Sequence, residues 1–403
     1  MAGRGGPLTG VKVIELAHIM AGPVCGLMLA DMGADVIKVE KVPGGDDSRR
    51  FLPPDINGES AAFMMMNRNK RGIPINLKEP GGKEVLKRLL KTADVVIENY
   101  RIDTMDKLGL GYDDLKKDNP GLIYCAISGF GRTGPYAERG GFDLIAQGMS
   151  GLMSITGEGP GRPPVKMGAP ITDITAGILG AMAISAAYAH KLKTGEGQKI
   201  DASLFEAGIV HTYWQSAIGL ATGVAPGPMG SAHPLNGPYQ AFRTSDGWIT
   251  IGAANQKNWL RLLDVLEAPK IADDPRFTEN SDRMGHLKEL EDLLGEIFKN
   301  HTTEDWLNRL DAAGVPAGPV LDVNQMHEDP HVLAREMVVE VDHSRLGAVK
   351  TLGLPVKFSE TPGWVAEAAP VYGQHTREVL AEYEYGDEEI EKLITSGAVA
   401  AVD

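Results

Sequence analysis

Short apolar runs separated by helical patterns occupy the chain up to about residue 130. A short apolar run between turn residues is typical of a strand buried on both faces of a parallel sheet. Alternating strands and helices predict an α/β fold with a doubly wound parallel sheet. The expected strands are 11–16, 34–40, 72–77, 94–99 and 122–128, with helices from residue 22 to about 32 and over 80–91 between them.

The pattern changes after residue 222. A Gly/Pro-rich segment, 223–238, precedes a predicted hairpin over 239–253 and further helices. We therefore expect a smaller α+β domain at 223–325. The remaining residues, 326–403, are assigned with 1–222 to a discontinuous large domain. A chain of 403 residues is too long for one small core. One helix is expected to end near Lys193, before Gly195. The other expected helices of the later part of the chain are 203–220, 257–267, 285–299, 303–313, 376–383 and 387–395.

Composition and charge exclude several classes of protein. A net charge of −14 argues against binding to a nucleic-acid backbone. The cysteines, Cys25 and Cys125, belong to no CxxC motif, so neither a metal site nor a disulfide framework is expected. The N-terminus lacks a signal-peptide pattern. The longest apolar run, 178–189, is predicted to be too short to span a membrane, and we expect a cytoplasmic protein without a membrane partner.

Asp173 is the single acidic residue of the stretch 167–177, immediately before the apolar run 178–189. A helix that is apolar all round is expected to be buried. Asp173 would then lie at the start of a buried helix, where free amide groups favour an anion. Two compatible interpretations follow: Asp173 caps the helix, which its local sequence favours, or it is a nucleophilic carboxylate.

A glycine-rich segment, Gly129-Phe-Gly131-Arg-Thr-Gly134, follows the strand 122–128. It matches the G-x-G-x-x-G spacing of a dinucleotide site. The hypothesis that the protein is an oxidoreductase that binds nicotinamide depends on this motif alone. However, Pro135 follows at once, no amphipathic helix begins here, and the strand is a late one. We interpret the segment as a flexible loop beside a ligand.

Several segments together resemble the class III CoA-transferase family, which includes formyl-CoA transferase and carnitine CoA-transferases. The resemblance runs from residue 8 to nearly the C-terminus. It is carried by residues 10–16, 21–23, 33–40, 67–71, 94–99, 129–131, 168–173 and 193–201.

The resemblance implies a Rossmann-like large domain, a smaller second domain and an interlocked homodimer. It implies acyl-CoA and a carboxylic acid as substrates, with no permanently bound cofactor or metal, and Asp173 as the nucleophile. Lys41 and Lys107 stand where the family commonly has Arg. The positions that match the CoA-binding segments are His18, Ile19, Met20, Lys41, Ile75, Lys78, Asn99, Tyr100, Arg101, Lys107, Ser128, Gly129, Phe130 and Gly131.

The implied reaction moves CoA from an acyl-CoA donor to an acid through an aspartyl anhydride and an aspartyl-CoA thioester. Segments 232–234 and 238–242 resemble the branch that uses succinyl-CoA. One alternative is an α-methylacyl-CoA racemase, but its catalytic His is replaced by Phe142. Another is a non-catalytic acyl-CoA-binding protein. The cation that would bind an acidic acceptor remains open among Arg68, Arg71, Arg139, His211 and His233.

Overall fold

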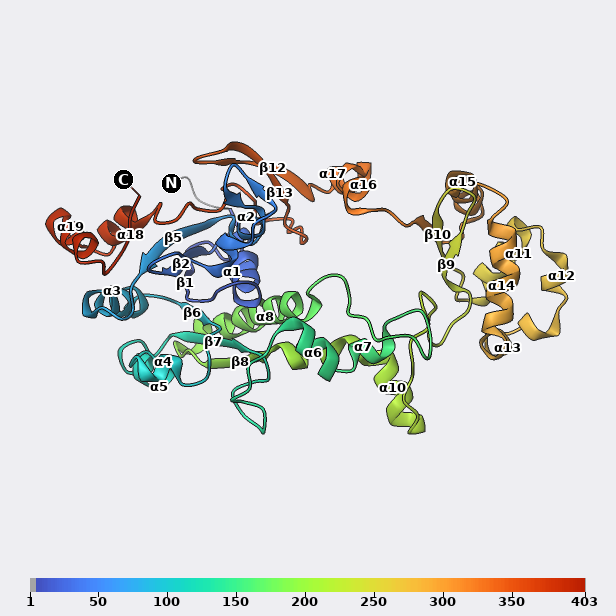
Figure 1. The fold of residues 1–403 in the computed structure, drawn as a ribbon, viewed down its shortest axis with the longest axis horizontal. Coiled ribbons are helices and arrows are strands. Elements are labelled where there is room, and N and C mark those ends of the chain that lie inside the picture. The colour runs from blue at the N-terminus through green and yellow to red at the C-terminus, as the bar shows by residue number, and fades with distance from the viewer. Residues whose placement is uncertain (1–4, 403) are drawn as a thin grey trace. The chain divides into compact units, whose positions relative to one another are not determined.

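The computed structural model describes residues 5–402, which form two compact units (Figure 1). The first unit holds the described residues up to Gly151, then Met167–His211, and the chain from Pro330 onward. The second unit holds Leu152–Lys166 and Thr212–Asp329. The first unit carries most of the residues that the sequence singles out.

A parallel sheet organises the first unit. Within residues 5–402 it has six strands in the order β5-β2-β1-β6-β7-β8. This confirms the predicted doubly wound α/β fold. The strand order reverses between β1 and β6, and ligands of such sheets bind at this switch point, outside the carboxyl ends of the strands. The strands are β1 Lys12–Glu15, β2 Asp35–Lys41, β5 Lys70–Ile75, β6 Val95–Glu98, β7 Ile123–Ser128 and β8 Lys199–Ser203.

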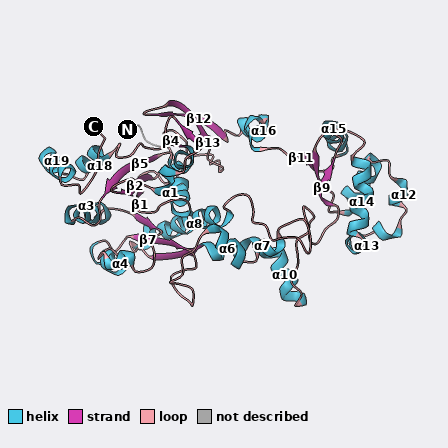
Figure 2. Ribbon diagram, in the orientation of Figure 1, coloured by secondary structure: helices cyan, strands magenta, loops and turns pink. Residues whose placement is uncertain are grey.

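Helices cover both faces of the sheet (Figure 2). Neighbouring strand residues point to opposite faces, so Val13 packs with α1, α8 and α9 while Ile14 packs with α3, α5, α18 and α19. Each buried Val, Leu or Ile contributes about 1.5–3 kcal/mol. The helices of this unit are α1 Ala21–Asp31, α2 Ala61–Asn67, α3 Pro80–Lys91, α4 Thr104–Lys107, α5 Tyr112–Asp118, α6 Asp143–Met149, α8 Ile171–Thr194, α9 Leu204–Ile209, α17 Pro330–Ala334, α18 Thr376–Glu382 and α19 Asp387–Thr395.

Short elements complete the first unit. Two small hairpins flank the main sheet, and a 3-10 helix follows β2. They are η1 Asp47–Arg50, β3 Asp55–Ile56, β4 Glu59–Ser60, β12 Val338–His343 and β13 Gly347–Leu352.

The helix that carries Asp173 is less buried than the sequence predicts. α8 runs for 24 residues and ends at Gly195 in the left-handed conformation. Among the described residues it alone is long and apolar enough, by length and composition, to cross a membrane, because the helix extends beyond the apolar run 178–189 at both ends. One face packs on α1 and β7, whereas Ile178 (48% exposed), Met182 (62%) and Leu192 (71%) lie on the surface. The expectation of burial all round is therefore wrong, because these apolar side chains of the second face are exposed.

The second unit contains the predicted hairpin, β9 with β10, and its helices surround a core that includes Trp259, Phe298 and Trp306.

The single helix predicted from Ser203 to about Leu220 is wrong. α9 ends at Ile209, a 3-10 turn covers Val210–Thr212, and α10 begins at Tyr213. The tighter turn places His211 beside Thr175. The remaining elements are α7 Leu152–Ile155, α10 Tyr213–Thr222, β9 Tyr239–Arg243, β10 Trp248–Gly252, α11 Gln256–Val265, α12 Pro269–Ala272, η3 Pro275–Phe277, α13 Asn280–Gly285, α14 Leu287–Phe298, α15 Thr303–Ala313, β11 Ala317–Pro319 and α16 Val323–Glu328.

Candidate active site

Asp173 lies in the first turn of α8, but it does not cap the helix. The N-cap position belongs to Pro170, and no hydrogen bond to the Asp173 carboxylate occurs among residues 5–402. Asp143, at the start of α6, accepts hydrogen bonds from the Thr172 backbone N (3.0 Å) and from Thr172 Oγ1 (2.8 Å). The cap interpretation of Asp173 is therefore wrong, because Asp143 satisfies the free amide. The Asp173 carboxylate keeps its lone pairs available.

Burial, together with the smaller effect of the negative charge of Asp143, raises the pKa of Asp173 to about 7. The start of a helix favours an anion, but the loss of water around the carboxylate outweighs this effect here. Active sites commonly perturb the pKa of a reacting group in this way. Near neutral pH a large fraction of Asp173 is ionised, poorly solvated and without hydrogen bonds, as a carboxylate nucleophile requires.

The glycine loop after β7 lies close to the segment that contains Asp143. A Cβ atom placed on Gly129 would lie 2.5 Å from the Gly141 Cα, so the two backbones touch without side chains between them. The Gly131 N donates to Ser128 Oγ (3.0 Å), which closes the turn. The structure thus connects Ser128–Gly131, through Gly141 and Asp143, to the first turn of α8.

His18, Asn99 and Tyr100 meet at the switch point between β1 and β6. The His18 N donates to Asn99 Oδ1 (2.9 Å), and Asn99 Nδ2 donates to the His18 O (2.8 Å). The Tyr100 hydroxyl lies 3.5 Å from His18 Nε2. Burial and the charge of Lys38 lower the pKa of His18, so its imidazole is neutral at pH 7.

Ile19 and Met20 complete the turn after β1. Ile19 has a φ of 68°, which costs a branched residue on the order of 1–3 kcal/mol. Its backbone N donates to both carboxylate oxygens of Asp46, at 3.1 and 3.2 Å. A hydrogen bond to a charged group contributes about 1.5–3 kcal/mol, enough to offset that cost. Met20 is the N-cap residue of α1.

The other predicted CoA contacts follow neighbouring strands at the same edge of the sheet. Lys41 ends β2, with its Nζ 2.5 Å from Asp47 Oδ1, and Ile75 ends β5 in the core. Lys78 is exposed just beyond β5. Arg101 and Lys107 come after β6, are exposed, and form no ion pair with any described residue.

Two of the five proposed acceptor-binding cations are already neutralised. Arg68 Nη2 lies 2.6 Å from Asp31 Oδ2. Arg71 pairs with Asp35 at 2.6 Å and with Glu382 at 2.8 Å. Both guanidiniums are buried.

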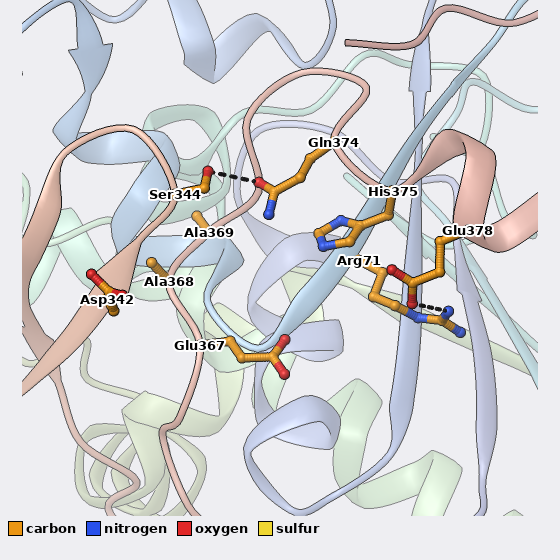
Figure 3. A pocket seen from close by; sticks show the side chains of 9 residues that line it. All are labelled: Arg71, Asp342, Ser344, Glu367, Ala368, Ala369, Gln374, His375 and Glu378. Atoms are coloured by element: carbon orange, nitrogen blue, oxygen red, sulfur yellow. Dashed lines mark hydrogen bonds and ion pairs between the residues drawn. The ribbon is translucent and has the colours of Figure 1, made fainter. Parts of the chain in front are cut away.

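Arg71 also lines a cavity of about 340 Å³ (Figure 3). Carboxylates of Asp342, Glu367 and Glu378 surround this cavity, which does not include Asp173. Such a lining repels an anionic substrate, so this cavity is not the predicted site.

Three candidate cations are less constrained. The Arg139 guanidinium lies 4.7 Å from the Tyr136 ring centroid and forms no ion pair with the described residues. His211 Nε2 lies 2.7 Å from Thr175 Oγ1, two residues after Asp173 on α8. His233, in the second unit, accepts a hydrogen bond at Nδ1 from the Leu235 N (3.1 Å). Arg139 and His211 therefore remain candidates in the unit that carries Asp173.

Residues 8–376 match CoA-transferase family III. The chain belongs to this family. It is 42% identical over 390 residues to succinate–glutarate CoA-transferase of Agrobacterium fabrum, an alignment that covers 95% of this chain and 97% of that protein. It is 37% identical over 394 residues to human succinyl-CoA:glutarate CoA-transferase, with 98% of this chain and 90% of that protein covered.

A solved structure supports the family III assignment. The crystal structure of a CaiB/BaiF family protein from Brucella suis has a TM-score of 0.84, with 42% identity over 94% of this chain and 100% of that chain. The protein is a family III CoA-transferase, and several relatives, including the human one, are named for succinyl-CoA. The expected family, fold and enzyme class are confirmed.

Sequence reasoning missed two residues that shape the site. In the sequence Asp143 follows Phe142 without belonging to a recognisable motif, and Asp46 lies in a loop rich in Gly, Pro and Asp. An acid that caps a distant helix, or binds the amide of a distant turn, leaves no periodic signal. Asp46 directly after two glycines, Gly44 and Gly45, was the available hint that a buried carboxylate closes that loop.

Proposed function

We propose that the enzyme transfers CoA from succinyl-CoA to a dicarboxylic acid, with Asp173 as the covalent nucleophile. The observation that carries the proposal is the Asp173 carboxylate, partly buried in the first turn of α8, without hydrogen bonds in residues 5–402 and with its pKa raised to about 7. The names of the two relatives, both glutarate CoA-transferases, support the substrate class.

The first half of the reaction forms two covalent intermediates. An Asp173 oxygen attacks the thioester carbonyl, the C–S bond breaks, and CoA thiolate leaves a mixed anhydride. The thiolate then attacks the Asp173 carbonyl of the anhydride, releases succinate and forms an aspartyl-CoA thioester. Covalent catalysis divides one difficult exchange into easier steps. Backbone amides of the Gly129–Gly131 loop, other than the Gly131 N that donates to Ser128 Oγ, would supply donors for the oxyanions.

The second half reverses these steps with the acceptor. The acceptor carboxylate attacks the aspartyl-CoA thioester and gives a new anhydride with CoA thiolate. The thiolate attacks the acyl carbonyl of the acceptor, forms the product thioester and frees Asp173. The free energy of the succinyl-CoA thioester bond is conserved in the thioester bond of the product. Water must stay out of the site, because it would hydrolyse either intermediate.

CoA binding is assigned to the carboxyl edge of the sheet. The turn His18–Met20 and the segment Asn99–Arg101 flank the switch point, where the fold binds ligands. Lys41, Arg101 and Lys107 would balance the negative charge of the CoA phosphates. Ile75, Lys78 and the loop Ser128–Gly131 extend the same edge after β5 and β7.

A homodimer is part of the proposal. Ile178 and Met182 are one turn apart on the uncovered face of α8, and a second copy of the chain would bury them. The cytoplasmic location stays a prediction.

The racemase alternative lacks a second proton carrier. Phe142 is the N-cap residue of α6, is 72% exposed, and directly precedes Asp143. A phenyl ring cannot exchange a proton, so we expect no deuterium exchange at the α-carbon of a 2-methylacyl-CoA in heavy water.

The test is mass detection of new acyl-CoA species after incubation with succinyl-CoA and a panel of acids that includes glutarate, malate, citramalate, mesaconate, itaconate and oxalate. We expect a new thioester with at least one dicarboxylate. Asp173→Ala should abolish it, and wild-type enzyme stopped during turnover should carry CoA covalently on Asp173. The control is Asp113→Ala, which removes another first-turn carboxylate, from the exposed start of α5. Undiminished transfer by Asp173→Ala would overturn the assignment.

A further inference from the structure

The turn that leads from β1 into α1 depends on a residue outside every segment assigned to substrate. We propose that Asp46 is a positioning residue: it holds the turn His18–Met20, and with it the start of α1, in the conformation that binds the acyl-CoA. The inference rests on the proposed role of that turn in CoA binding.

Asp46 is fully buried and gathers several donors on one carboxylate. Besides the Ile19 N, its Oδ1 accepts from the Ser48 N (2.9 Å) and from Ser48 Oγ (2.8 Å). Lys38 Nζ lies 2.9 Å from Oδ2. Burial alone would raise the pKa of Asp46, but the Lys38 ammonium and these hydrogen bonds hold the pKa well below its usual range. The carboxylate is therefore charged at any pH at which the enzyme works.

The turn cannot hold its shape by local preference. Ile19 adopts the left-handed conformation, which branched residues strongly disfavour. Asn99 fixes the peptide groups of His18, and the Asp46 carboxylate receives the Ile19 amide. Removing the charge at Asp46 would leave that amide and the Lys38 ammonium with a weaker acceptor, so the turn would lose its main restraint.

A buried ionic chain anchors Asp46 to the sheet. Lys38 Nζ donates to Glu15 Oε1 (2.9 Å) and to the Ala17 O (2.9 Å). Lys70 Nζ lies 2.7 Å from Glu15 Oε2, so the chain of charges crosses β2, β1 and β5. These side chains are fully buried, and removing one member leaves an uncompensated charge inside the protein.

The restraint reaches the helix of Asp173 through α1. A Cβ atom on Gly177 would lie 2.6 Å from the Ala21 O, so the first residue of α1 touches α8 one turn after Asp173. Asp47, the neighbour of Asp46, also pairs with Lys41. The same short loop therefore contacts two segments assigned to CoA, and the start of α1 that follows the turn lies against α8.

The experiment compares Asp46→Asn with Asp31→Asn in the full-length enzyme. Asp31 is equally buried and binds Arg68 and Asn69, but it touches no segment assigned to substrate, so it controls for the general loss of a buried carboxylate. Both variants should unfold at a lower temperature than wild type. Asp46→Asn should weaken CoA binding in a calorimetric titration at least ten-fold, raise KM for succinyl-CoA similarly, and leave KM for the acceptor acid within two-fold. Asp31→Asn should leave CoA affinity within two-fold.

Ser48→Ala provides a milder variant in case Asp46→Asn does not fold. It removes one hydrogen bond to Asp46 and leaves the charge, and we expect two- to five-fold weaker CoA binding. Equal CoA affinities for wild type, Ser48→Ala and any folded Asp46→Asn would overturn the proposal, as would an equal loss in Asp31→Asn. The titration needs no turnover. If wild-type enzyme binds CoA but transfers it to no acid, the proposed reaction is contradicted. The role of Asp46 in CoA binding can still be measured in that case.

Discussion

Asp143 accepts two hydrogen bonds from Thr172, one from the backbone N and one from Oγ1, and this places its negative charge beside Asp173. The same carboxylate thus fixes the start of α8 and raises the pKa of Asp173. Asp143 therefore restrains the helix turn that carries the proposed nucleophile Asp173, and it also makes Asp173 harder to ionise. Both effects can be separated experimentally.

Asp143→Asn should shift the pH dependence of activity. The amide oxygen can still accept from Thr172, but the charge beside Asp173 is gone, so the pKa of Asp173 should fall by ~1 unit. Activity needs ionised Asp173, so kcat/KM should rise with pH through about 7 in wild type and at lower pH in the variant. The measurement is the pH profile of kcat/KM with succinyl-CoA. Identical profiles would contradict the coupling, and Asp113→Asn is the control.

Asp173 should make stability depend on pH. Its pKa is about 7 in the folded protein and near 3.8 when unfolded, so the folded state holds more protons between these values. The free energy of unfolding therefore falls as pH rises from 4 to 7. Because Asp173 is partly exposed, we expect Asp173→Asn to stabilise the protein on the order of 1–3 kcal/mol above pH 7. The gain should vanish near pH 4. Thermal unfolding of both proteins at pH 4, 6 and 8 tests this, and a gain independent of pH would contradict it.

Gly177→Ala should destabilise the protein and reduce transfer. The new methyl group would lie 2.6 Å from the Ala21 O and 2.8 Å from the Val24 Cβ, so α1 must move away from α8. Overpacking of this kind costs about 1–3 kcal/mol. Gly295→Ala, in α14, is the matched control, because nothing lies within 4 Å of its Cβ position. It should be neutral or stabilise by about 0.5–1 kcal/mol. Urea unfolding of both variants gives the comparison.

Met182→Glu should disrupt the homodimer. A charge in a buried apolar interface is costly unless it is paired. We expect light scattering to show dimers for wild type and a shift toward monomers for the variant at micromolar concentration. Leu260→Glu changes a similarly exposed apolar residue on α11 and is the control. A dimer unaffected by Met182→Glu would place the interface elsewhere.

The parallel sheet was predictable because strands such as β6 and β7 are mostly apolar on both faces. The sequence also indicated the end of α8, where Gly195 adopts a left-handed conformation. It did not reveal the uncovered face of α8, because Ile178 and Met182 are as apolar as the residues of the packed face. Periodicity cannot distinguish a face buried in the same chain from one left on the surface.

The start of α8 was harder to predict than its end. Asp173 is a good capping residue by type, but Asp143, thirty positions earlier, takes that role in the fold. In the same way, the left-handed Ile19 depends on Asp46, and residue preferences disfavour that conformation. Residue preferences gave the wrong prediction where a hydrogen bond to a residue distant in sequence determines the backbone conformation.

The contact between Gly129 and Gly141 also bears on how such enzymes diverge. Neither position can gain a side chain alone, since a Cβ on either would lie within 2.5 Å of the other's Cα. The contact between the two glycines holds the two ends of the segment between them together. The mostly exposed residues 133–140 can therefore change in sequence and length over generations while this contact, and the distance from Ser128 to Asp143, stays fixed. Selection can vary what this loop recognises without disturbing the carboxylate that reacts.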